Sequence, residues 1–433
     1  MRTILFSVSP IVAVLMAMPA DAQEKTDPAR MKATVETLVG FGTRHTASST
    51  EDPKRGIGAA RRWAGGELTR IADACDGCIV VANIARTFTG PRAPDGVEVV
   101  DVLGFQQGED PKRVVIVGGH IDSIVGDVMD HDADAPGAND DASGVAVVLE
   151  AARILSKHKF KATIVYAIFS GEEQGLWGGT LLAETARDKK WTVSAMLNND
   201  IVGNSIGQGG VEADKLVRVF SEGVRASEEL PAQIARRAAG GEDDGPSRAL
   251  AKLVDGVATG IPGGLDVFVD RRPDRFGRGG DHEPFLKLGY PAIRFTVGAE
   301  NWAGQHQYVR TEGGVKFGDT IDKMDFAYLA KVAAINVATI RRLAAAPAAP
   351  DAVSLAGALS RDTTVKWAAV PGAVGYRVRW RRTDSQNWTD NIDVKEPTAV
   401  LKNVPVDDNF IAVASLAADG AESVATFGER APR

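Results

Sequence analysis

Histidine and carboxylate residues stand where apolar segments of this chain end, and together these residue types can hold a metal ion. They are His120, Asp122, Asp140, Asp141, Glu172, Glu173, Asp200 and His306. Each alone has a structural explanation, such as a solvated turn or a helix-start carboxylate. Asp200 is harder to explain in that way, because a carboxylate that ends an apolar strand needs a partner. The joint occurrence of these residues favours a metal site.

Imidazole and carboxylate ligands without a thiolate favour zinc. Five protein ligands are too many for one catalytic zinc, which keeps a position open for water. They suit two ions that share one carboxylate and lie roughly 3.5–4 Å apart. One residue of the pair Glu172 and Glu173 is then free to act as general base, because neighbouring side chains point in different directions.

The elements that must position these residues alternate between short apolar strands and amphipathic helices. Strands are expected at 97–106, 113–120, 162–170, 193–200 and 291–298, and helices at 142–155 and 326–343, with two more between 31 and 72. Strands of this kind separated by helices indicate an α/β fold with a mostly parallel (mixed) sheet in three layers, helices covering both faces. Ligand sites in such sheets lie beyond the carboxyl ends of the strands. The polar segment from 205 to 280 is expected to form loops and helices over one end of the sheet.

The two ends of the chain have different compositions from the middle. Residues 1–22 combine one arginine, an apolar stretch and a small-residue cleavage pattern, which predicts a secretory signal peptide cut before Gln23. Residues 344–352 are rich in Ala and Pro and are interpreted as a linker. Residues 353–433 alternate apolar and polar residues between turn signals, which predicts a β-sandwich with Trp367 and Tyr376 in its core. This last segment resembles a fibronectin type III module.

Composition excludes some classes of partner. The chain has 433 residues, 44% of them hydrophobic, and a formal net charge of −7. Without a basic excess, it offers no surface for nucleic acid or anionic lipid. No membrane association is expected once the signal peptide is cleaved, because no later segment is long and apolar enough to span a bilayer. The two cysteines, Cys75 and Cys78, favour a local disulfide in an exported protein.

Five short motifs in their order along the chain resemble a known enzyme family. The segments HID, GANDDASG, FSGEEQG and NND, followed by a late histidine, are similar to those of the co-catalytic di-zinc aminopeptidases, metallopeptidase family twenty-eight. The likeness covers residues 30–343 and leaves the C-terminal segment outside. It implies a fold of the zinc-exopeptidase type and two zinc ions as cofactors.

The resemblance also implies a role for each matching residue. His120 and Asp200 would bind one zinc, Glu173 and His306 the other, and Asp140 would bridge the two. Glu172 would be the general base. Asp122 would lie behind His120 and orient its imidazole, and the peptide bond between Asp140 and Asp141 is expected to be cis.

Some positions depart from the family pattern or fall outside it. Gln305 stands where many relatives have a tyrosine, and Gly280 replaces a serine in the segment RFGRGGDHEPF. In that segment His282 is expected to form hydrogen bonds rather than bind metal, while Arg275 and Arg278 are candidates for contact with a substrate carboxylate. The remaining acidic residues of the 120–140 loop, which are Asp127, Asp130, Asp132 and Asp134, are interpreted as solvated rim residues, with a second cation or the substrate amine as the alternative.

The expected function is that of an exported, periplasmic or extracellular, zinc-dependent exopeptidase acting on peptide substrates. An aminopeptidase that removes N-terminal residues, using a zinc-bridged water and Glu172 as general base, fits best. A carboxypeptidase or dipeptidase of the same family is the first alternative, and a non-catalytic receptor-like binding protein is the second. The C-terminal module is a candidate for contact with a surface or polymer.

Overall fold

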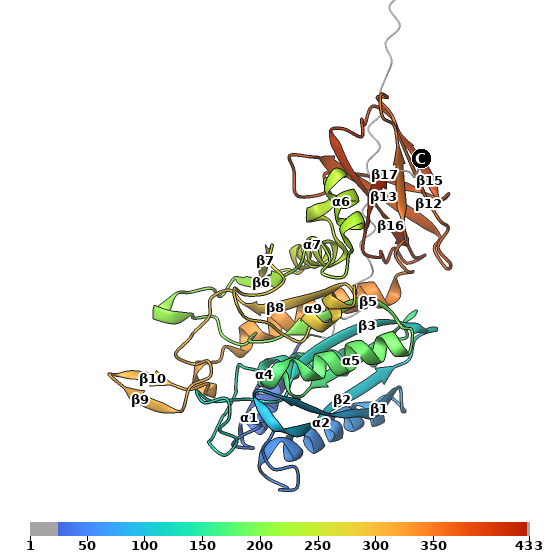
Figure 1. Ribbon diagram of the computed structural model, residues 1–433. Helices are drawn as coiled ribbons and strands as arrows, with labels where there is room; N and C mark the ends of the chain where they lie inside the picture. The colour runs from blue at the N-terminus through green and yellow to red at the C-terminus, as the bar shows by residue number, and fades with distance from the viewer. Residues whose placement is uncertain (1–24, 431–433) are drawn as a thin grey trace, which may run out of the picture.

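The computed structural model describes residues 25–430, and Figure 1 shows their arrangement. The predicted signal peptide, residues 1–22, lies outside this range. The helices are α1 (Pro28–Val39), α2 (Gly56–Asp73), α3 (Ala142–Leu155), α4 (Glu172–Gly175), α5 (Trp177–Asp188), α6 (Leu230–Ala238), α7 (Pro246–Thr259), α8 (Glu283–Lys287) and α9 (Phe326–Ala345). Among the described residues, no helix has the length and apolar character needed to cross a membrane.

The larger part of the molecule is built on one mixed sheet. Its strands are β1 (Ile79–Gly90), β2 (Ala93–Gln106), β3 (Asp110–His120), β4 (Ala162–Phe169), β5 (Thr192–Asn199), β6 (Leu216–Phe220), β7 (Asp266–Asp270) and β8 (Ala292–Val297). They lie in the order β1-β2-β4-β3-β5-β8-β6-β7. The central strands β4, β3, β5 and β8 run parallel to one another, so their carboxyl ends meet at one edge of the sheet. A separate two-stranded hairpin, β9 (Arg310–Glu312) and β10 (Val315–Phe317), projects from one side of the molecule in Figure 1.

Helices cover both faces of this sheet because the central strands are apolar on both sides. On one face, α1, α2, α3, α7 and α9 pack in a single buried cluster that includes Val115, Val117 and Ile164. On the other face, α5 and α8 cover the alternate residues of the same strands, including Val114 and Ile116. Burial of aliphatic side chains on both faces holds the layers together. The three-layer α/β architecture predicted from the sequence is confirmed.

The segment from 205 to 280 was expected to form only loops and helices, and this expectation was wrong. Besides α6 and α7, it contributes β6 and β7, which extend the sheet beyond β8. Both strands have only five residues; Arg218 interrupts the apolar pattern of β6, and aspartates at both ends of β7 leave it a short apolar run. The sequence therefore lacks the continuous β-branched run that made the other strands recognisable.

A second sheet follows α9. Its strands are β11 (Val353–Ala356), β12 (Thr363–Trp367), β13 (Gly375–Arg382), β14 (Asp390–Val394), β15 (Thr398–Leu401), β16 (Asn409–Leu416) and β17 (Thr426–Arg430), in the order β14-β13-β16-β17-β11-β12-β15. As predicted, Trp367 and Tyr376 lie in its core, with ring centroids 5.1 Å apart. The likeness to fibronectin type III and the exact limits of the linker and module stay predictions.

The C-terminal strands lie beside α6 in Figure 1, where Arg236 of α6 approaches Glu429 of β17, and Arg342 of α9 reaches the loop between β16 and β17. Two acidic residues are buried at this junction. Glu422 is 3% exposed and forms ion pairs with Arg342, Arg377 and Arg379, while Asp244 pairs with Arg381 and Lys252. In the described part of the junction, each of these two buried carboxylates therefore has at least two cationic partners.

The predicted local disulfide is present. Cys75 and Cys78 are bonded directly after α2, at the turn that leads into β1. The bridge links two residues of one turn and leaves no free cysteine in the described part of the chain.

Candidate metal centre

His120 ends β3 and is fixed by the residue two positions later. Its Nδ1 lies 3.0 Å from the backbone oxygen of Asp122 and 3.5 Å from the carboxylate. The carboxylate of Asp122 instead accepts hydrogen bonds from the hydroxyl of Thr46 and the backbone N–H of Glu173, each at 3.1 Å. Asp122 thus connects the end of β3 with the start of α4, and its backbone oxygen holds the imidazole orientation.

The acidic loop after β3 is closed by a buried arginine and a buried aspartate. Arg44 is completely buried, and its guanidinium donates to the carbonyls of Ile121 and Gly137, at opposite ends of the loop. Asp319 accepts the backbone N–H of Asp140 at 2.7 Å. These contacts bring Asp140 to His120 although twenty positions separate them in the sequence, with His120 Nε2 3.2 Å from Asp140 Oδ1.

Asp140 and Asp141 serve different purposes. The peptide bond between them is cis, as the family resemblance implies. The side chain of Asp141 accepts the backbone N–H of Gly144 as the N-cap of α3, and also that of His120. Asp141 therefore satisfies backbone donors, while the carboxylate of Asp140 is left for the site.

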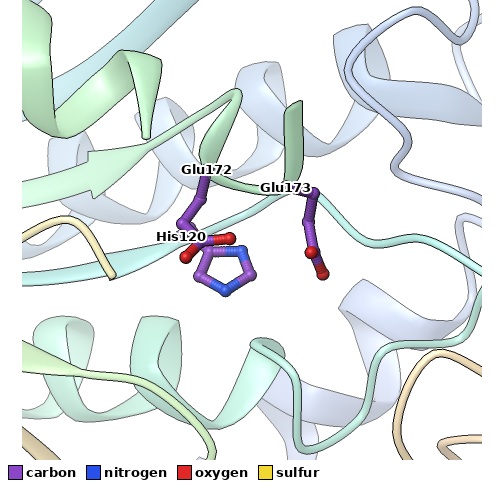
Figure 2. A group of neighbouring side chains, drawn as sticks. All are labelled: His120, Glu172 and Glu173. Carbon is purple, nitrogen blue, oxygen red and sulfur yellow. The ribbon is translucent and has the colours of Figure 1, made fainter. Parts of the chain in front are cut away.

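The two glutamates follow β4 at a sharp turn. Gly171 has a φ of +72°, a conformation that favours glycine, and it turns the chain from β4 into α4. Figure 2 shows Glu172 and Glu173 projecting from adjacent backbone positions into the same space as the His120 ring. Burial raises the pKa of Glu172 well above its ordinary value; His120 opposes this effect and Glu173 adds to it.

The remaining two predicted ligands come from the next two parallel strands. Asp200 follows β5, with Oδ1 4.0 Å from His120 Nε2. His306 lies in the loop after β8, at a φ of +49°, and its Nε2 is 2.9 Å from Asp140 Oδ2 and 3.1 Å from Glu173 Oε1.

The structure thus brings all the predicted ligands to one edge of the sheet. Potential ligand atoms lie within 4.8 Å of one another in the groups His120, Asp140, Asp200 and Asp140, Glu173, His306, and also in His120, Glu172, Glu173. The first two groups share Asp140. The binding of a metal by these residues stays a prediction. The arrangement specifies which residues would share each ion.

The site carries an excess of negative charge. Burial on its own would lower the pKa of His306, but the carboxylates of Glu173 and Asp140 raise it to about 11. For His120, burial again lowers the pKa, while Glu172, Asp122 and Asp140 raise it well above its ordinary value. Both imidazoles therefore lie in a field that favours positive charge, which a dication would supply.

The donor atoms fit zinc. His120 Nε2 and Glu173 Oε1 are both buried, and their approaches to Asp140 and His306 do not have the geometry of hydrogen bonds, although buried polar atoms in proteins are normally paired. Imidazole nitrogens and carboxylate oxygens are the donors that catalytic zinc sites use. The described residues therefore form a chemically suitable zinc site, with enough donors for two ions that share Asp140.

Sequence reasoning missed three residues that build the site. They are Arg44 and Asp319, which close the acidic loop, and Arg294 of β8, which is completely buried with its Nη2 2.7 Å from Asp200 Oδ1. A signal for Arg294 was present: it is the single charged residue in the apolar run PAIRFTVG, and the buried Asp200 needed a partner. Arg44 and Asp319 stand in irregular segments that gave no such signal.

The rim residues fall into two groups. Asp130 accepts the hydroxyl of Tyr308 at 2.9 Å, and Asp134 pairs with Arg55, so both stabilise the fold of the loop. Asp127 accepts only a nearby backbone N–H, and Asp132 is almost fully exposed.

The segment with glycine at 280 turns mostly inward. His282 is buried and its Nε2 lies 2.7 Å from the carbonyl of Pro273. The side chain of Arg275 is 9% exposed and pairs with Asp274, whereas that of Arg278 is 33% exposed. Of the two arginines considered for substrate contact, only Arg278 is therefore available to a ligand.

Comparisons with known proteins agree with this arrangement. A "Probable zinc metalloprotease" from Pyrenophora teres f. teres is 40% identical over 425 residues, which cover 95% of this chain and 88% of that protein. A leucine aminopeptidase precursor from Bacteroides thetaiotaomicron has the same fold (TM-score 0.53, 17% identity, 74% of this chain and 98% of that one). So does a glutaminyl cyclase from Porphyromonas gingivalis (TM-score 0.50, 17% identity, 73% and 98%), so the fold alone does not select the reaction. The family model for Peptidase family M28 matches residues 101–339, a range that contains every predicted metal ligand, and the chain therefore belongs to Peptidase family M28.

Proposed function

We propose that this member of Peptidase family M28 is a zinc-dependent exopeptidase, and specifically an aminopeptidase that removes N-terminal residues from peptides. The observation that carries the proposal is the convergence of two ligand groups that share Asp140, with Glu172 beside them. In this proposal His120, Asp140 and Asp200 hold one zinc, and Asp140, Glu173 and His306 hold the other.

The protein's own groups supply the proton transfers. Zinc held at the site would act as a Lewis acid toward the scissile carbonyl and would acidify water. Glu172, whose carboxylate points into the site beside the His120 ring, takes the proton of the attacking water and returns it to the leaving amine. Asp122 contacts both the His120 imidazole and the backbone N–H of Glu173, and these contacts fix the start of α4 relative to His120. Glu172 is thereby held at this position.

The test is the variant Glu172→Gln, which keeps the shape of the side chain but cannot accept a proton. We expect zinc content to remain that of the wild type while kcat for aminoacyl p-nitroanilides falls by about 10² to 10⁴. Glu36→Gln, an exposed glutamate of α1, is the matched control and should behave as the wild type. Full activity in Glu172→Gln would refute the role of base. Bound zinc with no hydrolysis of any peptide by the wild type would instead favour the receptor-like alternative.

A carboxypeptidase or dipeptidase is the second candidate, and one observation favours it. Arg278 donates to Glu300 and Gln305, and the rest of its guanidinium is open at the site. Burial opposes its charge, yet Asp140, Glu300 and Asp200 raise its pKa, and its partner Gln305 directly precedes the proposed ligand His306. A free substrate carboxylate could pair with this arginine.

A panel of dipeptides that are free or blocked at either end distinguishes the two candidates. An aminopeptidase requires a free amine and tolerates a C-terminal amide. If Arg278 binds the C-terminal carboxylate of the substrate, amidation of that carboxylate should raise KM for the wild type and have little effect on KM for Arg278→Met. Cleavage of N-acetylated dipeptides, combined with loss on amidation, would replace the aminopeptidase proposal by the carboxypeptidase one.

Export and the role of the C-terminal strands are further parts of the proposal. We propose cleavage before Gln23, a peptidase domain over residues 30–343, a linker over 344–352 and a fibronectin-like module over 353–433 that contacts a surface or polymer. Amino-terminal sequencing of the protein recovered from outside the cytoplasm tests the first point. Pull-down of the full-length protein by insoluble polysaccharide or cell envelope tests the last, and binding to neither would contradict it.

A further inference from the structure

One of the proposed zinc ligands is in contact with a buried cation. The guanidinium of Arg294 lies with Nη2 2.7 Å from Asp200 Oδ1 and Nη1 2.9 Å from Asp274 Oδ2. Nη1 also donates to the carbonyl of Gly279 at 2.7 Å. Arg294 is completely shielded from solvent, so its charge acts on Asp200 without screening by water.

The residue at position 280 limits the space around this guanidinium. A β-carbon at position 280 would lie 3.3 Å from Arg294 Nη1 and 3.2 Å from His282 Nδ1. Both distances are tighter than ordinary van der Waals contact, so any larger residue at 280 would press on the guanidinium. Gly280 therefore leaves the room that Arg294 occupies.

A chain of alternating charges continues from Arg294 toward the loop that carries His306. Asp274 also accepts from Arg275, at 3.0 Å, and Arg275 approaches Glu300 at 3.6 Å. Because Asp274 is itself held by Arg275, Arg294 cannot turn away from Asp200 without also breaking its ion pair with Asp274 and its hydrogen bond to Gly279.

The other proposed ligands have no such partner. Within residues 25–430, the carboxylates of Asp140 and Glu173 form ion pairs with histidines only. The group that contains Asp200 therefore differs from the other in having a fixed cation in direct contact with one of its ligands, and Asp274 on the far side of that cation offsets part of its charge.

We propose that Arg294 is a positioning residue that fixes the Asp200 carboxylate and lowers its affinity for a dication, so that the two metal positions are unequal. The inference rests on the ligand assignment proposed above. A guanidinium bound to a carboxylate withdraws part of its negative charge and repels a dication on the other side of it. The position formed by His120, Asp140 and Asp200 should therefore bind zinc more weakly than the position formed by Asp140, Glu173 and His306.

Calorimetric titration of the metal-stripped, full-length protein with zinc in the presence of a competing chelator tests this inference without measuring activity. We expect two binding events whose affinities differ by about tenfold or more, and we expect Asp200→Asn to remove the weaker event only. Two events of equal affinity would overturn the inference and leave the proposed function intact. Absence of zinc binding would overturn both.

Substitutions at Arg294 separate positioning from a merely structural role. The double variant Arg294→Gln with Asp274→Asn removes one charge of each sign and retains the polar shape, and it should tighten the weaker event about fivefold or more with the tighter event unchanged. Arg294→Lys keeps the charge and should stay within about threefold of the wild type. If the double variant lowers the melting temperature of the metal-free protein but shifts neither affinity, Arg294 is only structural and the inference is wrong.

Discussion

The metal centre and the junction with the C-terminal strands both bury several charged groups, but they balance them differently. At the junction, three arginines surround Glu422, and Arg381 and Lys252 face Asp244. At the metal centre, Asp140, Glu172 and Glu173 have no arginine or lysine as an ion-pair partner within residues 25–430. Buried carboxylates that are balanced by cations in this way stabilise a contact, whereas buried carboxylates without such partners need a ligand of positive charge.

The largest effect is expected at the unbalanced region. Asp140→Asn removes the carboxylate that both ligand groups share. Zinc per chain should fall, and kcat/KM should decrease by about a thousandfold or more, because neither position would retain its full set of donors. Metal analysis of the purified variant, together with steady-state kinetics, measures both. Wild-type zinc content would contradict the shared role of Asp140.

At the balanced region we expect a loss of stability with no loss of zinc. Arg381→Met leaves the buried carboxylate of Asp244 with one cation fewer, which should lower the free energy of unfolding by about 3 kcal/mol. Adding Asp244→Asn should recover a substantial part of this loss, because the carboxylate that has lost its guanidinium partner is then no longer charged. Denaturant unfolding of the single and double variants gives the values, and equal stability of the two would contradict the charge-balance explanation.

Outside the metal centre, Glu222 is another buried carboxylate whose charge its neighbours only partly offset. It lies just after the end of β6. Burial raises its pKa to about 7 from 4.5, while the backbone N–H of Ala226 and the charge of Arg225 oppose the shift and Glu228 adds to it. The folded protein then binds the proton more strongly than the unfolded one, so its stability falls as the pH rises from about 4.5 to about 7.

Replacement of Glu222 by glutamine should remove this pH dependence. The stability of Glu222→Gln relative to the wild type should increase by about 2 kcal/mol between pH 4.5 and pH 8. Urea unfolding of both proteins at the two pH values measures the difference. A constant difference across this range would show that Glu222 ionises normally in the folded protein.

The smallest effect is expected for the rim of the acidic loop. The side chain of Asp132 is 92% exposed, and Asp132→Asn should change kcat/KM by less than about twofold, because solvent screens its charge. This variant is also the matched control for Asp140→Asn. A large rise in KM for substrates with a free amine would instead assign Asp132 to the binding of the amino terminus.

The sequence predicted the parts of the fold whose residues follow one simple pattern. Strands β3, β4 and β5 are continuous apolar runs, and the rule that parallel strands place functional residues at their carboxyl ends led directly to His120, Glu173 and Asp200. Strands β6 and β7 were not predicted because each has only five residues, with Arg218 in the middle of β6 and an aspartate at each end of β7. The family predicted from the five motifs is confirmed, while the role of each site residue awaits the variants above.

What the sequence could not supply was the partner of each buried group. Asp319 reaches Asp140 from 179 positions away, and Arg294 reaches Asp200 from 94 positions away. Such pairings depend on how loops pack at the edge of the sheet, and no local pattern encodes that distance. The interpretation of Asp122 shows the same limit, because its backbone oxygen rather than its carboxylate is closer to the imidazole.

The place of β17 in the second sheet has a consequence for biosynthesis. This strand, Thr426–Arg430, joins β16 on one side to β11 on the other, so it connects two halves that are translated earlier. Those halves cannot close into one array until β17 has been synthesised and has emerged from the ribosome. A message truncated a few codons before this point would yield a chain with an open sheet edge beside α6, a form that proteases and chaperones recognise.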